Sequence, residues 1–242
     1  MRRFYAPKEN FNDGKITLSL EETRHLRDVL RLRAGDTVRA FDGEGRELSC
    51  EIELIEKRET ILKILEEVSP LAPASNLDLT LATALLKGEK FDLVVQKAVE
   101  LGVARLVPVI TKRTDVKLKD SEKRVERWRK IALEAAKQSG RADLMKIEPP
   151  IDFKEFLKIR AIETSGNFLL FSEKSGESFS SINAGEKITA IIGSEGGWED
   201  SEIEAAKNSG FQIVTLKGRI LRAETAAIAI AAVLQHRFGD FN

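Results

Sequence analysis

The chain has 242 residues, of which 42% are apolar and 32% charged, an ordinary composition for a protein of one large or two small domains. No apolar run approaches the ~20 residues of a membrane-spanning helix. The basic N-terminus is not followed by the apolar core of a signal peptide, so we expect a cytoplasmic protein. The single cysteine cannot form an internal disulfide, and with two histidines a zinc site is not expected.

Basic and acidic side chains balance, at 39 each, but they are unevenly distributed along the chain. Residues 1–40 hold nine basic and six acidic side chains, and residues 105–146 hold thirteen and six. These segments therefore carry +3 and +7, and the remainder carries about −10. This asymmetry allows a basic face for a phosphate backbone. It is also typical of charged helices that are simply solvated, so charge alone does not identify a partner.

The first 70 residues are expected to fold mostly as short strands. Apolar residues alternate with polar ones from Glu47 to Ile55, which predicts a half-buried strand. The glycine-rich turn at 42–45 joins it to the preceding strand as a hairpin. The strands expected here are 37–41, 47–55 and 60–68. A small barrel-like domain fits this pattern.

One helix, over residues 21–33, is predicted to interrupt these strands. Three apolar residues share one side of it: Leu26, Val29 and Leu30. Three basic residues lie on the opposite side: Arg24, Arg27 and Arg31. The helix is therefore expected to be amphipathic.

The remaining residues form a different pattern. Residues 70–76 contain two prolines and small residues and are predicted to be a linker. Strands and helices then alternate, which indicates an α/β domain with a parallel sheet. The expected strands are 77–86, 106–110, 167–171, 187–192 and 211–216. The expected helices are 90–101, 121–139, a helix capped by Asp200 or Ser201 that ends at Gly210, and 224–238.

A glycine-rich segment, 193–197 (Gly-Ser-Glu-Gly-Gly), follows the apolar strand that ends at Ile192. In open α/β sheets ligands bind at the carboxyl ends of strands, and glycines let the backbone approach a ligand closely. The spacing matches neither the dinucleotide fingerprint nor a P-loop, which disfavours a nucleotide-binding oxidoreductase. Taken alone, the segment is equally consistent with an ordinary turn.

A second segment, 216–226, joins the last strand to the last helix and again places charged residues and a glycine at the carboxyl edge of the sheet. The helix that follows is apolar on all sides between Ala226 and Leu234, so we expect it to be buried on every side. A partner subunit can supply part of that burial. The alternative is a core helix in a monomer.

Six short motifs follow one another along nearly the whole chain. They are 2–5 (Arg-Arg-Phe-Tyr), 25–31 with Gly35 and Asp36, 96–103, 138–141 (Gln-Ser-Gly-Arg), 192–197 and 220–226. No single motif is specific, but in this order they resemble the RsmE family of 16S ribosomal RNA uridine methyltransferases, members of the SPOUT superfamily. The chain departs from the family at Ser194, where proline is usual, and at Glu199, where a Ser or Thr cap is common. Both differences can alter loop rigidity and cofactor affinity.

The resemblance implies an N-terminal PUA-like RNA-binding β-barrel over residues 1–70. It implies a C-terminal SPOUT α/β domain over residues 71–242, with a parallel sheet and a deep trefoil knot. It further implies a homodimer whose cofactor, S-adenosyl-L-methionine, lies among three loops beside the subunit interface. The residues expected to contact this cofactor are Leu170, Phe171, Ile192, Gly193, Gly196, Leu216, Ile220, Leu221, Ala223 and Thr225.

Methylation at nitrogen 3 of uracil requires that nitrogen to lose its proton, which leaves negative charge on the ring and its carbonyl oxygens. Arg222 is expected to stabilise this charge, because a guanidinium keeps its own proton. Glu195 or Glu224 is expected to act as the base or to orient the reacting groups. For Glu224, a favourable interaction with the helix dipole is an equal alternative.

RNA phosphates are expected to contact the first domain through Arg2, Arg3, Arg24, Arg27 and Arg31. His25 is expected to stack or to hydrogen-bond with RNA, although a lone histidine beside an apolar face is more often structural.

The expected partner is 16S ribosomal RNA in the small ribosomal subunit, with no membrane and no metal. Two alternatives stay open: a SPOUT methyltransferase that acts on another RNA, and a non-catalytic RNA-binding protein of ribosome assembly. The sequence does not show which nucleotide is modified, or whether naked RNA or an assembled subunit is the substrate.

Overall fold

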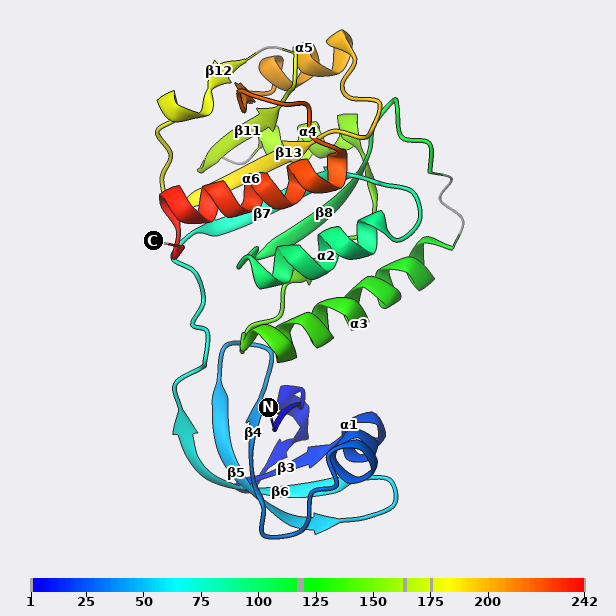
Figure 1. Ribbon diagram of the computed structural model, residues 1–242, viewed down its shortest axis with the longest axis vertical. Coiled ribbons are helices and arrows are strands. Elements are labelled where there is room, and N and C mark those ends of the chain that lie inside the picture. Colours follow the sequence, from blue (N-terminus) through cyan, green and yellow to red (C-terminus); the bar gives the residue numbers. More distant parts are fainter. Residues whose placement is uncertain (1, 117–119, 163–164, 175, 242) are drawn as a thin grey trace. The chain divides into compact units, whose positions relative to one another are not determined.

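The computed structural model describes residues 2–116, 120–162, 165–174 and 176–241, and it divides into two compact units (Figure 1). The first unit contains the chain up to Ala74 together with Leu133–Leu144. The second contains Ser75–Ala132 and the chain from Met145 onward. The first unit therefore includes a short segment from the middle of the sequence. The domain limits of 1–70 and 71–242 stay a prediction.

The first unit is built on a six-stranded sheet in the order β1-β4-β5-β6-β3-β2. β1 and β4 pair in parallel, and the other pairs are antiparallel. The strands are β1 (Arg3–Tyr5), β2 (Phe11–Asn12), β3 (Lys15–Leu18), β4 (Thr37–Phe41), β5 (Glu47–Ile55) and β6 (Thr60–Val68). A short 3-10 turn, η1 (Lys8–Asn10), precedes β2. The three strands predicted from the sequence are confirmed with their bounds.

The alternation predicted along β5 holds only for part of the strand. Leu48, Cys50 and Ile52 are buried, but Leu54 is 43% exposed. The pairing with β6 shifts register between Ile52 and Leu54, and such an irregularity turns the following side chain to the other face. The sequence pattern therefore predicts the strand but not the shift in register between Ile52 and Leu54.

The helix predicted over 21–33 is shorter than expected. It consists of α1 (Leu20–Arg24), whose N-cap Ser19 accepts a hydrogen bond from the Glu22 amide, and a π-helical turn, η2 (His25–Val29). The helical chain ends there, since Arg31 has a left-handed backbone with φ of 53°. Leu26 is buried, but Val29 is 66% exposed, so the prediction that Val29 shares the apolar side is wrong. A π turn places residues around the axis differently from an α-helix.

The second unit contains an eight-stranded sheet in the order β10-β8-β7-β13-β11-β14-β12, with β9 also paired to β8. All its pairs are parallel. The strands are β7 (Asp78–Ala84), β8 (Arg105–Ile110), β9 (Lys146–Ile147), β10 (Ile151–Asp152), β11 (Asn167–Phe171), β12 (Glu177–Ser178), β13 (Lys187–Ile192) and β14 (Gln212–Thr215). The expected parallel α/β sheet is confirmed, while the trefoil knot stays a prediction.

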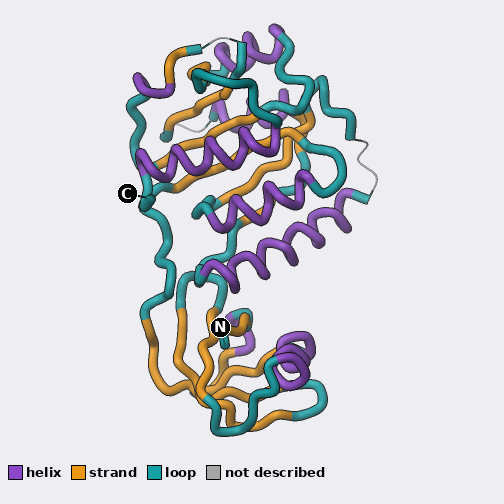
Figure 2. Tube along the Cα trace, in the orientation of Figure 1, coloured by secondary structure: helices purple, strands orange, loops and turns teal. Residues whose placement is uncertain are grey.

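Several helices follow the strands of this sheet along the chain, and Figure 2 distinguishes them from the strands by colour. They are α2 (Lys90–Glu100), α3 (Ser121–Ser139), α4 (Phe153–Ala161), α5 (Asp200–Asn208) and α6 (Ala223–Phe238), with a 3-10 turn η3 (Phe179–Ser181). In Figure 1, α2 and α6 lie in front of the sheet and α4 behind it. A buried apolar cluster joins α4, α5 and the strands, and it includes Phe156, Trp198 and Phe211.

Three sequence predictions for this unit need correction. The sequence analysis missed α4, which begins after the Asp152 side chain accepts hydrogen bonds from the next amides. The N-cap of α5 is Glu199, not Asp200 or Ser201; its amide donates to the Glu202 carboxylate at 3.0 Å. Finally, α6 is not buried on every side. One side carries half-buried small and apolar residues: Ile228, Ala229, Ala232 and Val233.

Candidate functional site

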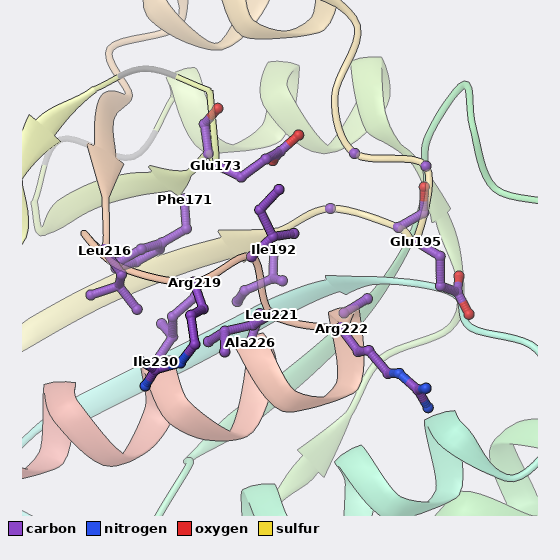
Figure 3. A pocket seen from close by; sticks show the side chains of 17 residues that line it. Phe171, Glu173, Ile192, Glu195, Leu216, Arg219, Leu221, Arg222, Ala226 and Ile230 are labelled. Atoms are coloured by element: carbon purple, nitrogen blue, oxygen red, sulfur yellow. The ribbon is translucent and has the colours of Figure 1, made fainter.

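A cavity of about 440 Å³ lies at the carboxyl ends of the neighbouring parallel strands β13, β11 and β14. The loop that follows each strand and the first two turns of α6 form its walls (Figure 3). The lining residues are Phe171, Ser172, Glu173, Ile192, Gly193, Ser194, Glu195, Gly196, Gly197, Leu216, Arg219, Ile220, Leu221, Arg222, Ala223, Ala226 and Ile230. The place and the volume are those of a small-molecule site in an open α/β sheet.

Most residues predicted to contact a cofactor line this cavity. They are Phe171, Ile192, Gly193, Gly196, Leu216, Ile220, Leu221 and Ala223. Two others do not line it. Leu170 is fully buried in the core cluster of the sheet, since its side chain and that of Phe171 leave β11 on opposite faces. Thr225 is exposed on α6. The binding role of the eight lining residues stays a prediction.

The glycines of the segment 193–197 lie close to neighbouring side chains of the protein itself. A Cβ at Gly193 would lie 3.1 Å from the Trp198 ring, and a Cβ at Gly197 would lie 2.5 Å from Glu173 Oε1. Gly197 also has φ of +67°, which disfavours other residues. The buried Trp198 ring is fixed in turn by its Nε1, which donates to the Phe171 carbonyl at 2.9 Å. The sequence left open whether these glycines serve ligand approach or an ordinary turn, and the structure adds packing against Trp198 as a further reason for Gly193.

The same segment forms a closed turn at the mouth of the cavity. The Gly197 amide donates to the Ser194 carbonyl at 2.9 Å, which is the hydrogen bond of a four-residue turn. Glu195, inside the turn, pairs with Lys90 at the start of α2, with 3.0 Å between Nζ and Oε1. This half-exposed pair orients the Glu195 carboxylate but is screened by solvent.

Arg222 is the N-cap residue of α6 and lies at the rim of the cavity. Among the described residues, none forms a hydrogen bond or an ion pair with its guanidinium. Figure 3 shows Arg222 pointing away from Ala226 on the side of the view where Glu195 also lies, whereas Arg219 points toward Ile230. A guanidinium with all its donors available can bind an anion at this end.

Glu224, the other predicted base, has a different position. It does not line the cavity, and it is buried in the first turn of α6. One of its carboxylate oxygens makes no hydrogen bond within the described part of the chain. Its position at a helix N-terminus favours the dipole interaction over contact with the reacting groups.

Several cavity residues were not predicted from the sequence. They are Ser172, Glu173, Ser194, Gly197, Arg219, Ala226 and Ile230. A signal existed for some of them. Ser172 and Glu173 directly follow a parallel strand, where ligand-binding residues are expected. Ala226 and Ile230 are four residues apart, so they share one face of α6.

The structure contradicts the prediction that Arg3 contacts RNA. Its side chain is buried, and its Nε and Nη2 donate to both carboxylate oxygens of Glu47 at 3.1 and 3.0 Å. The guanidinium also donates to the carbonyls of Ala136 and Arg141 at 3.0 and 2.6 Å, and it lies over the Phe41 ring. Arg3 is therefore a structural residue that connects the sheet of the first unit to the end of α3.

The other residues predicted to bind RNA are at least partly accessible. Arg24 and Arg31 are exposed, and Arg2 lies 4.0 Å from Asp36. Arg27 donates two hydrogen bonds to its neighbour Asp28, and this contact lowers the pKa of the aspartate. The partly buried His25 ring packs edge-on against Phe4, at 6.2 Å between centroids, which favours a structural role. For the arginines, RNA contact stays a prediction.

Within the described ranges, no three or more His, Cys, Asp and Glu side chains are grouped so that they could hold a metal ion. None of the described helices has the length and apolar character needed to cross a membrane.

The chain is similar to known proteins over nearly its whole length. Residues 73–235 match the family model of an RNA methyltransferase domain, and residues 19–65 match that of an RNA methyltransferase PUA domain. The PUA-like domain predicted from the sequence is thereby confirmed.

Individual relatives agree with these family models. The ribosomal RNA small subunit methyltransferase E of Synechocystis is 35% identical and aligns over 96% of this chain and 76% of its own length. The protein of the same name from Aquifex aeolicus is 30% identical, with 98% and 100% covered. A crystal structure of ribosomal RNA small subunit methyltransferase E from Neisseria gonorrhoeae bound to S-adenosyl methionine is 35% identical, with a TM-score of 0.91 and 100% of both chains covered.

Proposed function

The chain belongs to the RNA methyltransferase family, and from this membership and the geometry of the cavity we propose that it methylates nitrogen 3 of a uridine in 16S ribosomal RNA. The methyl donor is S-adenosyl-L-methionine. The observation that carries the proposal is the cavity itself, since the loop after β13 and the start of α6, which form part of its wall, coincide with two of the motifs that carry the family resemblance. A non-catalytic RNA-binding protein would have no need of such a cavity.

The residues of the cavity fit this cofactor. Apolar side chains at its inner end suit an adenine ring: Phe171, Ile192, Leu216, Leu221 and Ile230. The carboxylate of Glu173 suits ribose hydroxyls or the positively charged amino group of the cofactor. When bound, the cofactor supplies a methyl group on positively charged sulfur, which is already a strong electrophile.

The protein therefore contributes mainly position and charge. Correct orientation of two reactants can lower a barrier by roughly 7–11 kcal/mol. Arg222 stabilises the negative charge that uracil acquires when nitrogen 3 loses its proton, and it can do so because its guanidinium is not occupied by another residue in the described structure. Glu195, which lies on the same side of the view in Figure 3, receives that proton in this proposal.

The first unit binds RNA through its exposed arginines, and the target uridine leaves its stack to reach the cavity. The half-buried apolar side of α6 is covered by a second copy of the chain, so the active form is a homodimer. The enzyme acts in the cytoplasm, where its ribosomal substrate is found. Replacing Val233 on this side with aspartate is expected to yield monomers in sedimentation experiments, since it places a charge in an apolar interface.

The test is methyl transfer from labelled S-adenosyl-L-methionine to small-subunit particles and to total RNA from cells that lack the enzyme, followed by mass spectrometry of the nucleosides. Label in 3-methyluridine of 16S ribosomal RNA is the expected result. Label in another nucleoside would show that the fold and cofactor are right but the substrate is wrong. Absence of both label and cofactor binding would overturn the proposal.

A further inference from the structure

The segment 111–114 follows β8 and exchanges two hydrogen bonds with the turn 194–197. Each segment donates one of them. Ser194 Oγ donates to the Arg113 carbonyl at 3.0 Å, and Arg113 Nη1 donates to the Gly196 carbonyl at 2.7 Å. The segment is itself fixed, since the Thr111 amide donates to Thr114 Oγ1 at 3.0 Å. Arg113 does not line the cavity, but Ser194 and Gly196 do.

The Arg113 side chain lies along the turn because Gly196 has no Cβ. A Cβ there would lie 2.9 Å from Arg113 Cβ and 3.2 Å from Arg113 Cδ, which is closer than normal packing allows. The peptide group between Gly196 and Gly197 is thus held at both ends. Its carbonyl accepts from Arg113, and its amide donates to the Ser194 carbonyl at 2.9 Å.

Lys112, the preceding residue, has one partner in common with Arg113, whose Nε lies 3.8 Å from Glu199 Oε1. Its Nζ reaches Glu199 Oε2 at 3.0 Å and Ser201 Oγ at 2.8 Å, at the start of α5. Its amide donates to the Glu202 carboxylate at 2.9 Å. Lys112 and Arg113 therefore have similar charge and place, but only the Arg113 side chain donates to a residue that lines the cavity.

We propose that Arg113 is a positioning residue for the methyl donor, acting through the Gly196 carbonyl and the Ser194 hydroxyl. The inference rests on the proposed function. The two bonds hold the turn in its binding conformation before the cofactor arrives, so the cofactor does not have to order it. Pre-organisation of this kind strengthens binding without adding a contact to the ligand. It also fixes Glu195, which lies inside the turn.

The test compares the full-length chain with Arg113→Met, Arg113→Lys and Ser194→Ala, using S-adenosyl-L-methionine binding measured by calorimetry. We expect Arg113→Met to weaken binding about tenfold, equivalent to ~1.4 kcal/mol. Ser194→Ala should weaken it less, and Arg113→Lys should recover part of the loss because an ammonium can still donate to the Gly196 carbonyl. The double variant Arg113→Met/Ser194→Ala should lose less than the sum, since both bonds hold one turn.

Lys112→Met is the matched control, expected to bind the cofactor as the unaltered chain does. Thermal unfolding of each variant shows whether a loss of binding merely reflects a loss of stability. Weaker binding by Arg113→Met with an unchanged unfolding temperature supports the inference. Equal binding by Arg113→Met and the unaltered chain overturns it while leaving the proposed function intact. If the unaltered chain itself does not bind the cofactor, the inference about Arg113 and the proposed function are both wrong.

Discussion

Arg3 in the first unit and Arg222 in the second differ in what surrounds their guanidinium groups. Arg3 is buried, and its donors are directed to Glu47 and to the carbonyls of Ala136 and Arg141. Arg222 lies at the rim of a cavity, where the described structure provides it with neither a hydrogen bond nor an ion pair. A guanidinium that the protein has already satisfied stabilises the fold, whereas one left unsatisfied at a cavity is available for a ligand.

The largest effect is expected for Arg3→Met. It would leave the Glu47 carboxylate, which has 0% exposure, without its two strongest hydrogen bonds. Removing one partner of a buried pair costs ~3–5 kcal/mol in the free energy of unfolding. Chemical denaturation measures this loss. The control is Arg39→Met, because Arg39 is partly exposed and lies 3.5 Å from the same carboxylate, and it should cost no more than ~1 kcal/mol. Equal losses for the two variants would contradict the account of Arg3.

The second largest effect is expected in the rate of methyl transfer by the variant Arg222→Ala. Loss of a positioned donor to a developing negative charge slows a reaction by roughly 10²- to 10³-fold. Single-turnover rates at saturating cofactor measure this loss, while the stability should change by no more than ~0.5 kcal/mol. Arg219→Ala is the control, since Arg219 lines the same cavity but points to its other end. A normal rate for Arg222→Ala would remove Arg222 from the mechanism.

Local sequence patterns predict the strands and part of the cavity, but not the burial of Arg3. The bounds of β4, β5 and β6 and the parallel sheet of the second unit follow from local alternation and periodicity. Two loops of the cavity, after β13 and β14, follow from the rule that parallel strands present ligand sites at their carboxyl ends, whereas the loop after β11 is expected only from the family resemblance. The burial of Arg3 does not follow, because its partner Glu47 is 44 positions away and its carbonyl partners are more than 130 away.

The same limit applies to Arg113, whose partner Gly196 is 83 positions away in the sequence. No local pattern distinguishes it from Lys112 or from other solvated basic residues. Gly193 and Gly196, which are predicted to contact the cofactor, line the cavity, but their neighbours Trp198 and Arg113 become visible only in the fold. Local patterns therefore locate the site, and long-range contacts assign roles within it.

A smaller effect is expected for Arg24→Gln, which tests the exposed arginines of the first unit. Each phosphate contact that is lost reduces the slope of log affinity against log salt by about one. RNA binding measured over a salt series should show this change, with a loss of affinity of a few-fold at physiological salt. Glu21→Gln, at another exposed position of the same helix, should not reduce the slope. An unchanged slope for Arg24→Gln would exclude this arginine from the RNA contact.

At neutral pH the smallest effect is expected for Cys50, in the core of the first unit. Burial raises the pKa of its thiol to about 12 from an ordinary value of 9.0. The unfolded chain therefore releases this proton at lower pH than the folded chain, so Cys50 leaves stability unchanged below pH 9 and lowers it as the pH rises from 9 toward 12. Denaturation above pH 9 should show a steeper loss for the unaltered chain than for Cys50→Ala. If the free energy of unfolding fell equally with pH for both proteins above pH 9, burial would not raise the pKa of the thiol.

The most direct test of the contrast between the two arginines is a crystal structure of the chain with S-adenosyl-L-methionine. We expect the cofactor in the cavity formed by the loops after β11, β13 and β14, with its methyl group facing the end where Arg222 and Glu195 lie. A cofactor bound elsewhere, or one whose methyl group faces Ile230 and leaves Arg222 remote, would contradict the role given to the unsatisfied guanidinium.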